Sequence, residues 1–188
     1  MHFHWFNAPA LLTPKECAML IKHAKKRYPA QEAVVGHGAN ARADKMRTST
    51  IRWLSYSDLD LLWLRLRIEE KILIANREGF GYNIQPGFTE IQFTEYHGTA
   101  GGHYDWHEDN SAQMKKPFDR KLSFVLQLSD PKDYDGGVFE MHGDELPPRA
   151  FTQQGDALIF RSALKHRVTP VTRGTRYSLV TWVHGPRS

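Results

Sequence analysis

The sequence predicts an α+β fold in which N-terminal helices support a β-sandwich or jelly roll formed by the second half of the chain. Three observations lead to this prediction. Apolar residues recur with helical periodicity in the first 80 residues, they alternate with polar residues in several short segments after residue 90, and glycine-containing turns separate those segments. At 188 residues the chain can bury one core, so we expect a single domain, 1–188.

The first predicted helix begins at Thr13. Threonine is a preferred capping residue, Pro14 suits the first helical position, and Glu16 stands where it completes a capping box. Its apolar face has the spacing of a buried stripe and consists of Cys17, Leu20, Ile21 and Ala24.

A second helix is predicted to start with Ser57 or Asp58 as its cap and to end at Gly79 and Gly81. Its apolar stripe is predicted to consist of Leu59, Leu62, Leu66 and Leu73. Between the two helices, residues 28–47 are polar and aperiodic, which predicts a long loop of the kind that often covers or lines a binding site.

Strands are predicted where the period changes to two, around 91–94 and 122–128. Shorter strands are expected in the segments GGVFEM, ALIF, HRVT and RYSLVTWV. The helices should pack outside one of the resulting sheets.

Composition restricts the compartment and the partners. The chain has 25 basic and 21 acidic residues, a mild excess without a long charged block, so nucleic acid is not a favoured partner. It contains no apolar run of about 18 residues, and its single cysteine, Cys17, excludes an internal disulfide. We expect a soluble, cytoplasmic protein that does not bind membranes.

Two overlapping His-x-Asp patterns offer metal ligands, one at His103 and Asp105 and the other at His107 and Asp109. Residues two apart on a strand point to the same side, so an imidazole and a carboxylate can meet at one point. A distant histidine would complete a facial triad that leaves positions open on the metal, and His166, which opens a strand after a turn, is the candidate. The spacing alone does not decide between the two copies.

Arg176 and Ser178 follow on the last predicted strand and share one of its faces. An arginine inside a barrel is costly unless it is paired, yet no acidic residue lies near Arg176 in this segment. A bound dicarboxylate would supply the missing charge.

Together these residues resemble the Fe(II)/2-oxoglutarate-dependent oxygenases of the prolyl 4-hydroxylase-like group, and the bacterial PKHD-type hydroxylases in particular. The matching pattern runs from about Ile91 to Trp182. It consists of Gly101, Tyr104, His107 and Asp109, then Gly136 and Gly137, then Gly155 and Asp156, and finally His166, Arg176 and Trp182. Further upstream, the segment from Arg47 to Ser49 resembles the Arg-Thr-Ser segment on the substrate side of prolyl 4-hydroxylases.

The resemblance implies a double-stranded β-helix, a jelly-roll or cupin-like core, over 88–184, with helical support and a substrate loop in 1–80. It favours the second His-x-Asp copy and leaves His103 and Asp105 as loop residues. The implied cofactors are Fe(II), 2-oxoglutarate and O2, with ascorbate as a reductant. The implied site consists of metal ligands His107, Asp109 and His166, cosubstrate contacts Arg176, Tyr96, Ser178 and Gln127, and a substrate side lined by Tyr104, Arg120, Trp182 and Arg47.

The sequence departs from the family pattern at three positions. Gln127 stands where relatives have a tyrosine that helps to hold the cosubstrate, and Tyr96 lies one residue further from His107 than its counterpart in some relatives. Val138 replaces a glutamate that often follows the glycine pair. These departures affect the cosubstrate contacts and leave the triad intact.

The implied reaction is hydroxylation of an unactivated C–H bond of an amino-acid side chain, coupled to conversion of 2-oxoglutarate to succinate and CO2. The open loop at 28–47 slightly favours a substrate within a peptide or protein. A free amino acid or small metabolite, and nucleic-acid demethylation by the same chemistry, remain alternatives, as does a non-enzymatic jelly-roll binding module.

Overall fold

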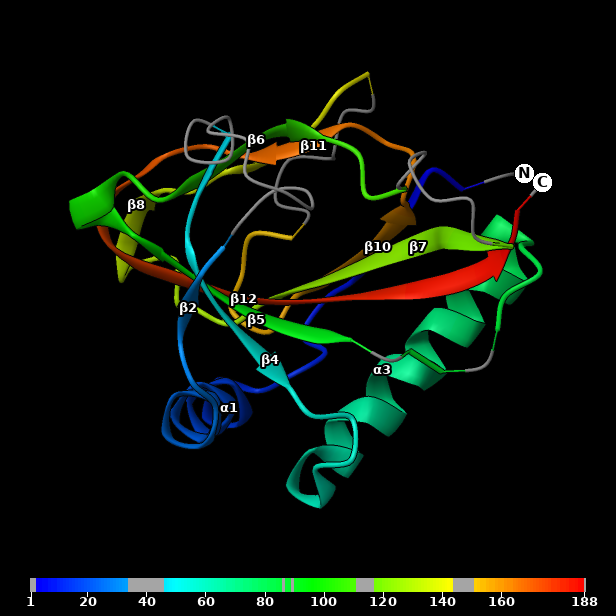
Figure 1. The fold of residues 1–188 in the computed structure, drawn as a ribbon, viewed down its shortest axis with the longest axis horizontal. Helices are drawn as coiled ribbons and strands as arrows, with labels where there is room; N and C mark the ends of the chain where they lie inside the picture. Colours follow the sequence, from blue (N-terminus) through cyan, green and yellow to red (C-terminus); the bar gives the residue numbers. More distant parts are fainter. Residues whose placement is uncertain are drawn as a thin grey trace.

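A computed structural model of the chain describes residues 3–33, 46–85, 87–88, 90–110, 117–143 and 151–187. Most of the predicted loop at 28–47 lies outside these residues. Two antiparallel sheets face each other, and two helices cover the outer side of the larger sheet (Figure 1). The expected packing of the helices outside one sheet is therefore confirmed.

The larger sheet has the strand order β1-β10-β7-β12-β5-β4-β2, with β8 paired to β12. Its strands are β1 (Trp5–Ala8), β2 (Gln31–Glu32), β4 (Thr50–Leu54), β5 (Ile91–His97), β7 (Phe118–Gln127), β8 (Tyr134–Gly136), β10 (Ala157–Arg161) and β12 (Val171–Pro186). The first 80 residues thus contribute strands at both ends of this sheet as well as helices.

The smaller sheet has the order β3-β6-β11-β9 and lies on the opposite side of the larger sheet from the helices (Figure 1). Its strands are β3 (Arg47–Thr48), β6 (His103–His107), β9 (Phe139–Met141) and β11 (His166–Val168). The chain passes from the smaller to the larger sheet at Ser49, between β3 and β4. A short 3-10 helix, η3 (Gly98–Ala100), connects β5 to β6.

Helix α1 (Pro14–Arg27) has the predicted N-terminus. The Thr13 hydroxyl accepts a hydrogen bond from the Glu16 amide, and the Glu16 carboxylate accepts one from the Thr13 amide, which completes the capping box. Cys17 is fully buried in the apolar face, and burial raises the pKa of its thiol to about 12, so it fills space as predicted.

Helix α3 (Leu62–Ala75) follows a 3-10 turn, η1 (Leu59–Leu61), which Asp58 caps, and continues into a π-helical turn, η2 (Asn76–Phe80). The left-handed Gly81 ends it, as predicted. The predicted apolar stripe is wrong in its orientation: Leu59, Leu62, Leu66 and Leu73 are between 40% and 80% exposed. The face that packs on the sheet instead consists of Leu61, Leu64, Ile68, Ile72 and Ala75.

The main core lies between the helices and the larger sheet. Strand β7 contributes Leu122, Phe124 and Leu126, and β5 contributes Ile91 and Phe93. Strict alternation turns the intervening residues of these strands to the other face, between the two sheets. No helix within the described ranges combines the length and the apolar character that a membrane span requires.

Candidate active site

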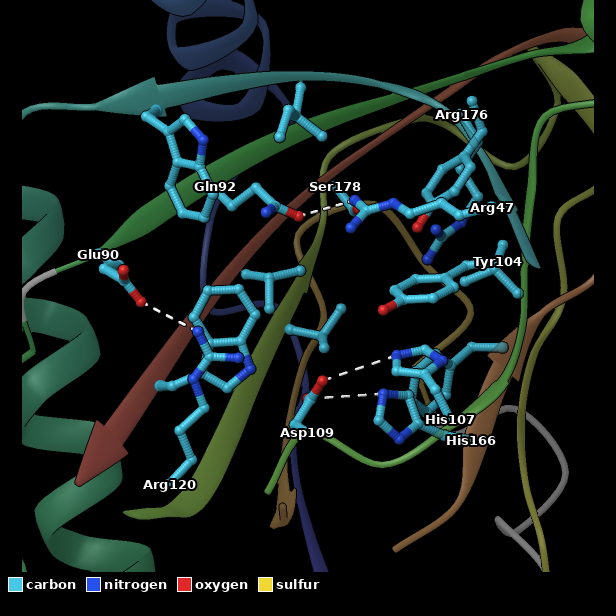
Figure 2. A pocket seen from close by; sticks show the side chains of 18 of the residues that line it. Arg47, Glu90, Gln92, Tyr104, His107, Asp109, Arg120, His166, Arg176 and Ser178 are labelled. Atoms are coloured by element: carbon cyan, nitrogen blue, oxygen red, sulfur yellow. Dashed lines mark hydrogen bonds and ion pairs between the residues drawn. The ribbon is translucent and has the colours of Figure 1, made fainter. Parts of the chain in front are cut away.

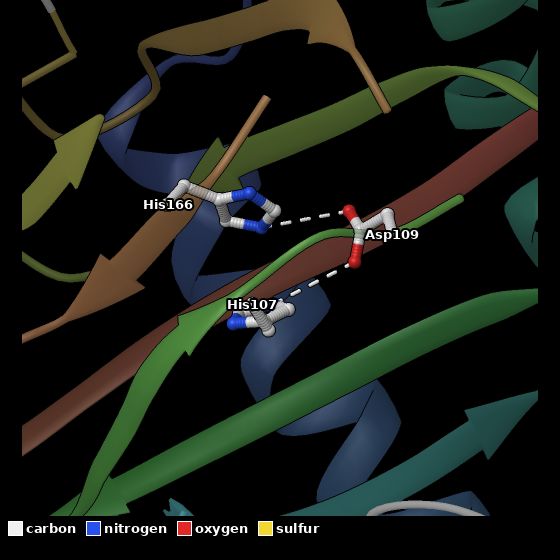
Figure 3. Close-up of side chains that lie close together, drawn as sticks. All are labelled: His107, Asp109 and His166. Atoms are coloured by element: carbon white, nitrogen blue, oxygen red, sulfur yellow. Dashed lines mark ion pairs between the residues drawn. The ribbon is translucent and has the colours of Figure 1, made fainter. Parts of the chain in front are cut away.

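Three predicted ligands meet between the sheets, as Figure 3 shows. His107 ends β6 and His166 begins β11, and the two residues are direct partners in the smaller sheet. The Nε2 atom of His107 lies 3.6 Å from Asp109 Oδ1, and that of His166 lies 3.5 Å from Asp109 Oδ2. One ligand atom from each residue lies within 4.8 Å of the other two.

Backbone contacts orient both imidazoles. The Nδ1 atom of His107 lies 2.7 Å from the carbonyl oxygen of Asp105, and that of His166 lies 2.8 Å from the carbonyl oxygen of Leu164. A carbonyl can only accept, so each Nδ1 carries a proton and each ring turns its Nε2 toward Asp109. This is the tautomer and orientation that a metal ligand needs.

The carboxylate of Asp109 is held just as firmly. The backbone amide of Asp109 donates to the carbonyl of Ser162 at 2.8 Å, and the side-chain Oδ2 accepts a hydrogen bond of 2.7 Å from the Ser123 hydroxyl. Ser123 was not predicted as a site residue, although its place on the inward-facing side of β7 follows from the alternation of that strand. Ser123 fixes one oxygen and leaves the remaining lone pairs directed at the histidines.

The electrostatics of the cluster favour metal binding. Burial and the adjacent His166 lower the pKa of His107 to about 4, so its ring is neutral at pH 7. Burial by itself raises the pKa of Asp109, but His166, His107 and the Ser123 hydroxyl outweigh it and hold this pKa below its ordinary value. Two imidazoles and one carboxylate, too far apart for direct hydrogen bonds, match the donor set of a ferrous facial triad.

The other His-x-Asp copy lies elsewhere. His103 and Asp105 are in β6 and not in a loop as expected, because β3 pairs with this segment and Thr48 lies opposite His103. Asp105 is exposed, and neither residue joins the metal cluster. In the described part of the chain a second group, His23, Asp58 and Asp60, has comparable spacing, but its Asp58 Oδ2 already contacts His23, Tyr28 and Arg27.

A cavity of about 480 Å³ opens beside the triad (Figure 2). All three triad residues line it, and so do the predicted residues Tyr96, Tyr104, Arg47, Arg120, Arg176, Ser178 and Trp182. Gln127 is the predicted site residue that does not line it. Its side-chain amide donates to the Tyr134 hydroxyl at 2.7 Å and to the Ser129 carbonyl, and neither partner lines the cavity.

Arg176 is 2% exposed and has no carboxylate within ion-pair distance in the described ranges. It lies opposite Tyr96 in the larger sheet, with its guanidinium carbon 5.7 Å from the centre of the Tyr96 ring. Gly137 has a left-handed backbone and passes so close that a Cβ there would lie 2.9 Å from Arg176 Cδ. The glycine pair of the motif thus provides space for this arginine.

The remaining cavity arginines differ in their partners. Arg120 is 3.0 Å from the Glu90 carboxylate and stacks at 3.8 Å on the Trp182 ring. Arg47 donates to the Ser49 hydroxyl at 2.7 Å and to the Gln92 side-chain oxygen at 2.8 Å (Figure 2). Sequence reasoning missed Glu90 and Gln92, although Gln92 shares a strand face with Tyr96 and could have been found from the alternation.

Aromatic stacking connects the substrate side to the triad. Tyr104 stacks on the His107 imidazole with ring centres 3.5 Å apart, and the Arg47 guanidinium lies 4.5 Å above the same tyrosine ring. Burial raises the pKa of Tyr104 to about 12, so its phenol remains protonated at neutral pH.

Comparisons with known proteins agree with this geometry. The family model of the 2OG-Fe(II) oxygenase superfamily matches residues 91–184, half of the chain, and the chain therefore belongs to this superfamily. The family implies Fe(II), 2-oxoglutarate and O2 as its cofactors, and the His-Asp-His cluster fits the iron.

Two groups of individual proteins are similar. A PKHD-type hydroxylase of Pseudomonas fluorescens is 38% identical over 88 residues, and another, of Maricaulis maris, is 45% identical over 62 residues. These matches cover 45% and 33% of this chain but only 39% and 28% of the relatives. The chain thus matches well under half the length of these curated relatives.

Solved structures share the fold over nearly the whole chain. A prolyl-4-hydroxylase of Pseudomonas putida superposes with a TM-score of 0.70 at 21% identity, covering 98% of this chain and 94% of that one. A viral collagen prolyl hydroxylase from Paramecium Bursaria Chlorella virus-1, in complex with 2OG, gives 0.71 at 17% identity and covers 97% of both chains. The sheet-rich architecture with two helices is therefore that of the prolyl hydroxylases.

Proposed function

We propose that this protein is an Fe(II)- and 2-oxoglutarate-dependent dioxygenase that hydroxylates an unactivated C–H bond of an amino-acid side chain, with a peptide or protein slightly favoured as substrate. One observation supports this proposal above all others. The His107, Asp109 and His166 cluster lines the same cavity as Arg176, for which the described residues offer no carboxylate partner. A metal and an anionic cosubstrate would satisfy both features at once.

In this proposal His107, Asp109 and His166 hold the iron, and the planar fork of Arg176 receives the distal carboxylate of 2-oxoglutarate. When bound, the iron and cosubstrate would supply the oxidising chemistry, in which the substrate, 2-oxoglutarate and O2 give the hydroxylated substrate, succinate and CO2. Tyr96 and Ser178 flank the arginine, whereas Gln127 does not line the cavity and donates to the Tyr134 hydroxyl instead.

The chain contributes orientation and exclusion of water. The two backbone-anchored imidazoles and the Ser123-anchored carboxylate keep the ligand set in place before the metal arrives. The aromatic walls, Tyr104 beside the triad and Trp182 beneath Arg120, restrict the space in which a substrate C–H bond can approach.

The organisation of the chain is part of the proposal. We propose that the two facing sheets form a double-stranded β-helix of the jelly-roll type, with 1–80 as support and substrate loop and 88–184 as the catalytic core within a single domain, 1–188. The lone, buried Cys17 is compatible with the reducing cytoplasm that we propose as the location. Ascorbate is proposed as the reductant that keeps the iron ferrous.

The proposal is tested by metal binding and turnover in matched variants. His107→Ala and Asp109→Ala should each abolish Fe(II) binding and succinate release, because either change removes one of three protein ligands. Asp105→Ala and His103→Ala remove the same groups from β6 outside the cluster and should retain most of both properties.

The assay is anaerobic titration with Fe(II) and 2-oxoglutarate, followed by visible absorption, and then succinate release in air over amino acids, peptides and oligonucleotides. Loss of binding in the His103 and Asp105 variants, with retention in the His107 and Asp109 variants, would show that the wrong copy was chosen. If the unsubstituted protein shows neither the visible absorption nor succinate release, the non-enzymatic binding module is the remaining interpretation.

A further inference from the structure

Two arginines of the described chain are buried, Arg47 at 8% and Arg176 at 2% exposure, and both line the cavity. Neither has a carboxylate within ion-pair distance among the residues that the structure describes. A carboxylate lies within 4.0 Å of six other arginines, Arg27, Arg52, Arg67, Arg120, Arg167 and Arg173. The remaining arginines of the described chain are not buried, so Arg47 and Arg176 are the ones in which burial and the lack of a described carboxylate coincide.

The contacts of Arg47 leave most of its donors available. A guanidinium has five N–H groups. In Arg47, Nε donates to the Ser49 hydroxyl and Nη2 donates to the Gln92 side-chain oxygen, and both acceptors are neutral. These two bonds fix the plane of the guanidinium, and its positive charge remains without a counter-charge in the described surroundings. Such a buried charge is costly unless a ligand neutralises it.

The cofactors do not supply that counter-charge. Arg120 and Glu90 neutralise each other. Fe(II) with Asp109 carries one net positive charge, and this charge together with Arg176 balances the two carboxylates of 2-oxoglutarate. Among the described residues that line the cavity, Arg47 would then be the one positive charge without a counterpart.

Arg47 is also close to the reacting centre. One aromatic ring, that of Tyr104, separates its guanidinium from the His107 imidazole, with contacts of 4.5 Å and 3.5 Å on the two faces. This short separation allows a group held by Arg47 and a C–H bond held at the metal to belong to a single amino-acid residue.

We infer that Arg47 binds a carboxylate of the substrate, and that the substrate is an amino acid with a free α-carboxylate, either a free amino acid or the C-terminal residue of a peptide. This inference rests on the proposed function and narrows its substrate class. A residue inside a peptide offers a neutral carbonyl in place of the carboxylate and leaves the charge of Arg47 uncompensated.

The test compares acids with their amides. Each of the twenty L-amino acids is offered to the protein as the free acid and as the α-amide, and again as the C-terminal residue of an N-acetylglycyl dipeptide in both forms. Binding is measured by anaerobic calorimetric titration in the presence of Fe(II) and 2-oxoglutarate. We expect one or more acids to bind roughly 10- to 100-fold more tightly than the matching amides, the usual effect of a charge-assisted hydrogen-bonded pair.

Three variants test whether Arg47 causes the preference for acids over amides. Arg47→Gln should reduce acid binding to the level of the amide, and Arg47→Lys, which keeps the charge, should retain part of the preference. The control Arg173→Gln removes an exposed arginine that pairs with Asp135, and it should change neither acid binding nor amide binding. The visible absorption with Fe(II) and 2-oxoglutarate should persist in all three variants, which shows that they are folded and loaded.

Each outcome decides the question. Equal binding of acids and amides, tighter binding of amides, no binding of any acid in either series, or equal loss of both forms in Arg47→Gln would overturn the inference. Failure of the proposed function would appear differently, as absence of the Fe(II) and 2-oxoglutarate absorption in the unsubstituted protein. Free acids and C-terminal acids are distinguished by which of the two series binds.

Discussion

Each residue of the triad is positioned by a contact that lies away from the metal side. His107 and His166 donate to backbone carbonyls two residues earlier, at Asp105 and Leu164, and Asp109 accepts from Ser123. These contacts fix tautomer and orientation before any ion binds, which reduces the cost of organising the ligands. Because the pKa of His107 is lowered to about 4, protons hardly compete with a metal for its Nε2 at neutral pH.

Arg176→Ala should weaken 2-oxoglutarate binding roughly 10- to 150-fold, equivalent to about 1.5 to 3 kcal/mol, because it removes a buried, charge-assisted contact. Fe(II) affinity should change little, since Arg176 does not belong to the triad. Separate anaerobic titrations with 2-oxoglutarate and with Fe(II) measure the two effects. Arg173→Ala, on the same strand but exposed, serves as the control, and equal weakening of both ligands would assign Arg176 a structural role.

At the scale of elements, β12 shows how one strand serves two purposes. Leu179 and Val183 face the main core beneath the helices, whereas Arg176 and Ser178 face the cavity. The period of two makes this division possible, so the strand that completes the core also presents the cosubstrate residues. Strand β5 is divided in the same way, with Phe93 in the core and Tyr96 in the cavity wall.

Helix α3 has apolar residues on nearly all sides, and periodicity alone could not identify the buried one. Leu64 is fully buried and Leu66, two positions later, is 57% exposed. The predicted stripe of leucines was internally regular, but the competing stripe that includes Ile68 and Ile72 fits the sheet. Packing against strands that are distant in sequence determines which face of α3 is buried.

This arrangement predicts unequal costs for two identical substitutions. Leu64→Ala should lower the free energy of unfolding by about 2 to 5 kcal/mol, since it opens a cavity in the core. Leu66→Ala should change it by no more than about 0.5 kcal/mol, because its side chain is mostly in solvent. Urea denaturation of the two variants measures both values, and a larger loss for Leu66→Ala would place the wrong face of α3 on the sheet.

At the scale of the whole molecule, the site depends on segments far apart in the chain. The smaller sheet brings β3, β6 and β11 together, so Arg47, His107 and His166 meet although more than a hundred residues separate the first from the last. On the far side of the larger sheet, one carboxylate connects the two helices. Asp58, which caps the turn before α3, receives hydrogen bonds from His23 at 2.8 Å and from the Tyr28 hydroxyl at 2.5 Å.

Asp58 should make stability depend on pH. Burial by itself raises its pKa, but the hydrogen bonds from Tyr28 and His23 outweigh burial and lower it to about 2. The folded state therefore binds the Asp58 proton less tightly than the unfolded state does. The stabilisation is fully present above about pH 4 and is lost as the pH falls toward 2.

Asp58→Asn should accordingly lower the free energy of unfolding by about 2 kcal/mol at pH 7, with the difference from the unsubstituted protein narrowing as the pH is reduced to 3. Denaturant titrations across this range provide the measurement. Asp60→Asn, an exposed neighbour, should have little effect at any pH. A difference for Asp58→Asn that stays constant from pH 7 to 3 would contradict the charge as its cause.

Much of this protein was determined by the sequence itself. The capping box at Thr13 and the alternation along 122–128 are local signals, and they predicted their elements correctly because backbone propensity and side-chain period act over a few residues. The motif that contains His107, Asp109, His166 and Arg176 likewise indicated the family by its resemblance to the family pattern. The turn expected at Arg173 and Gly174 is wrong, since both residues lie within β12.

Other features were decided by the tertiary structure alone. Pairing with β3 made His103 and Asp105 part of a strand, and the larger sheet selected the buried face of α3. The isolation of Arg47 from any described carboxylate became visible only when the sheets were assembled, because charge compensation depends on distance in space. Local sequence sets the period and the caps, whereas burial and neutralisation of charge are properties of the packed molecule.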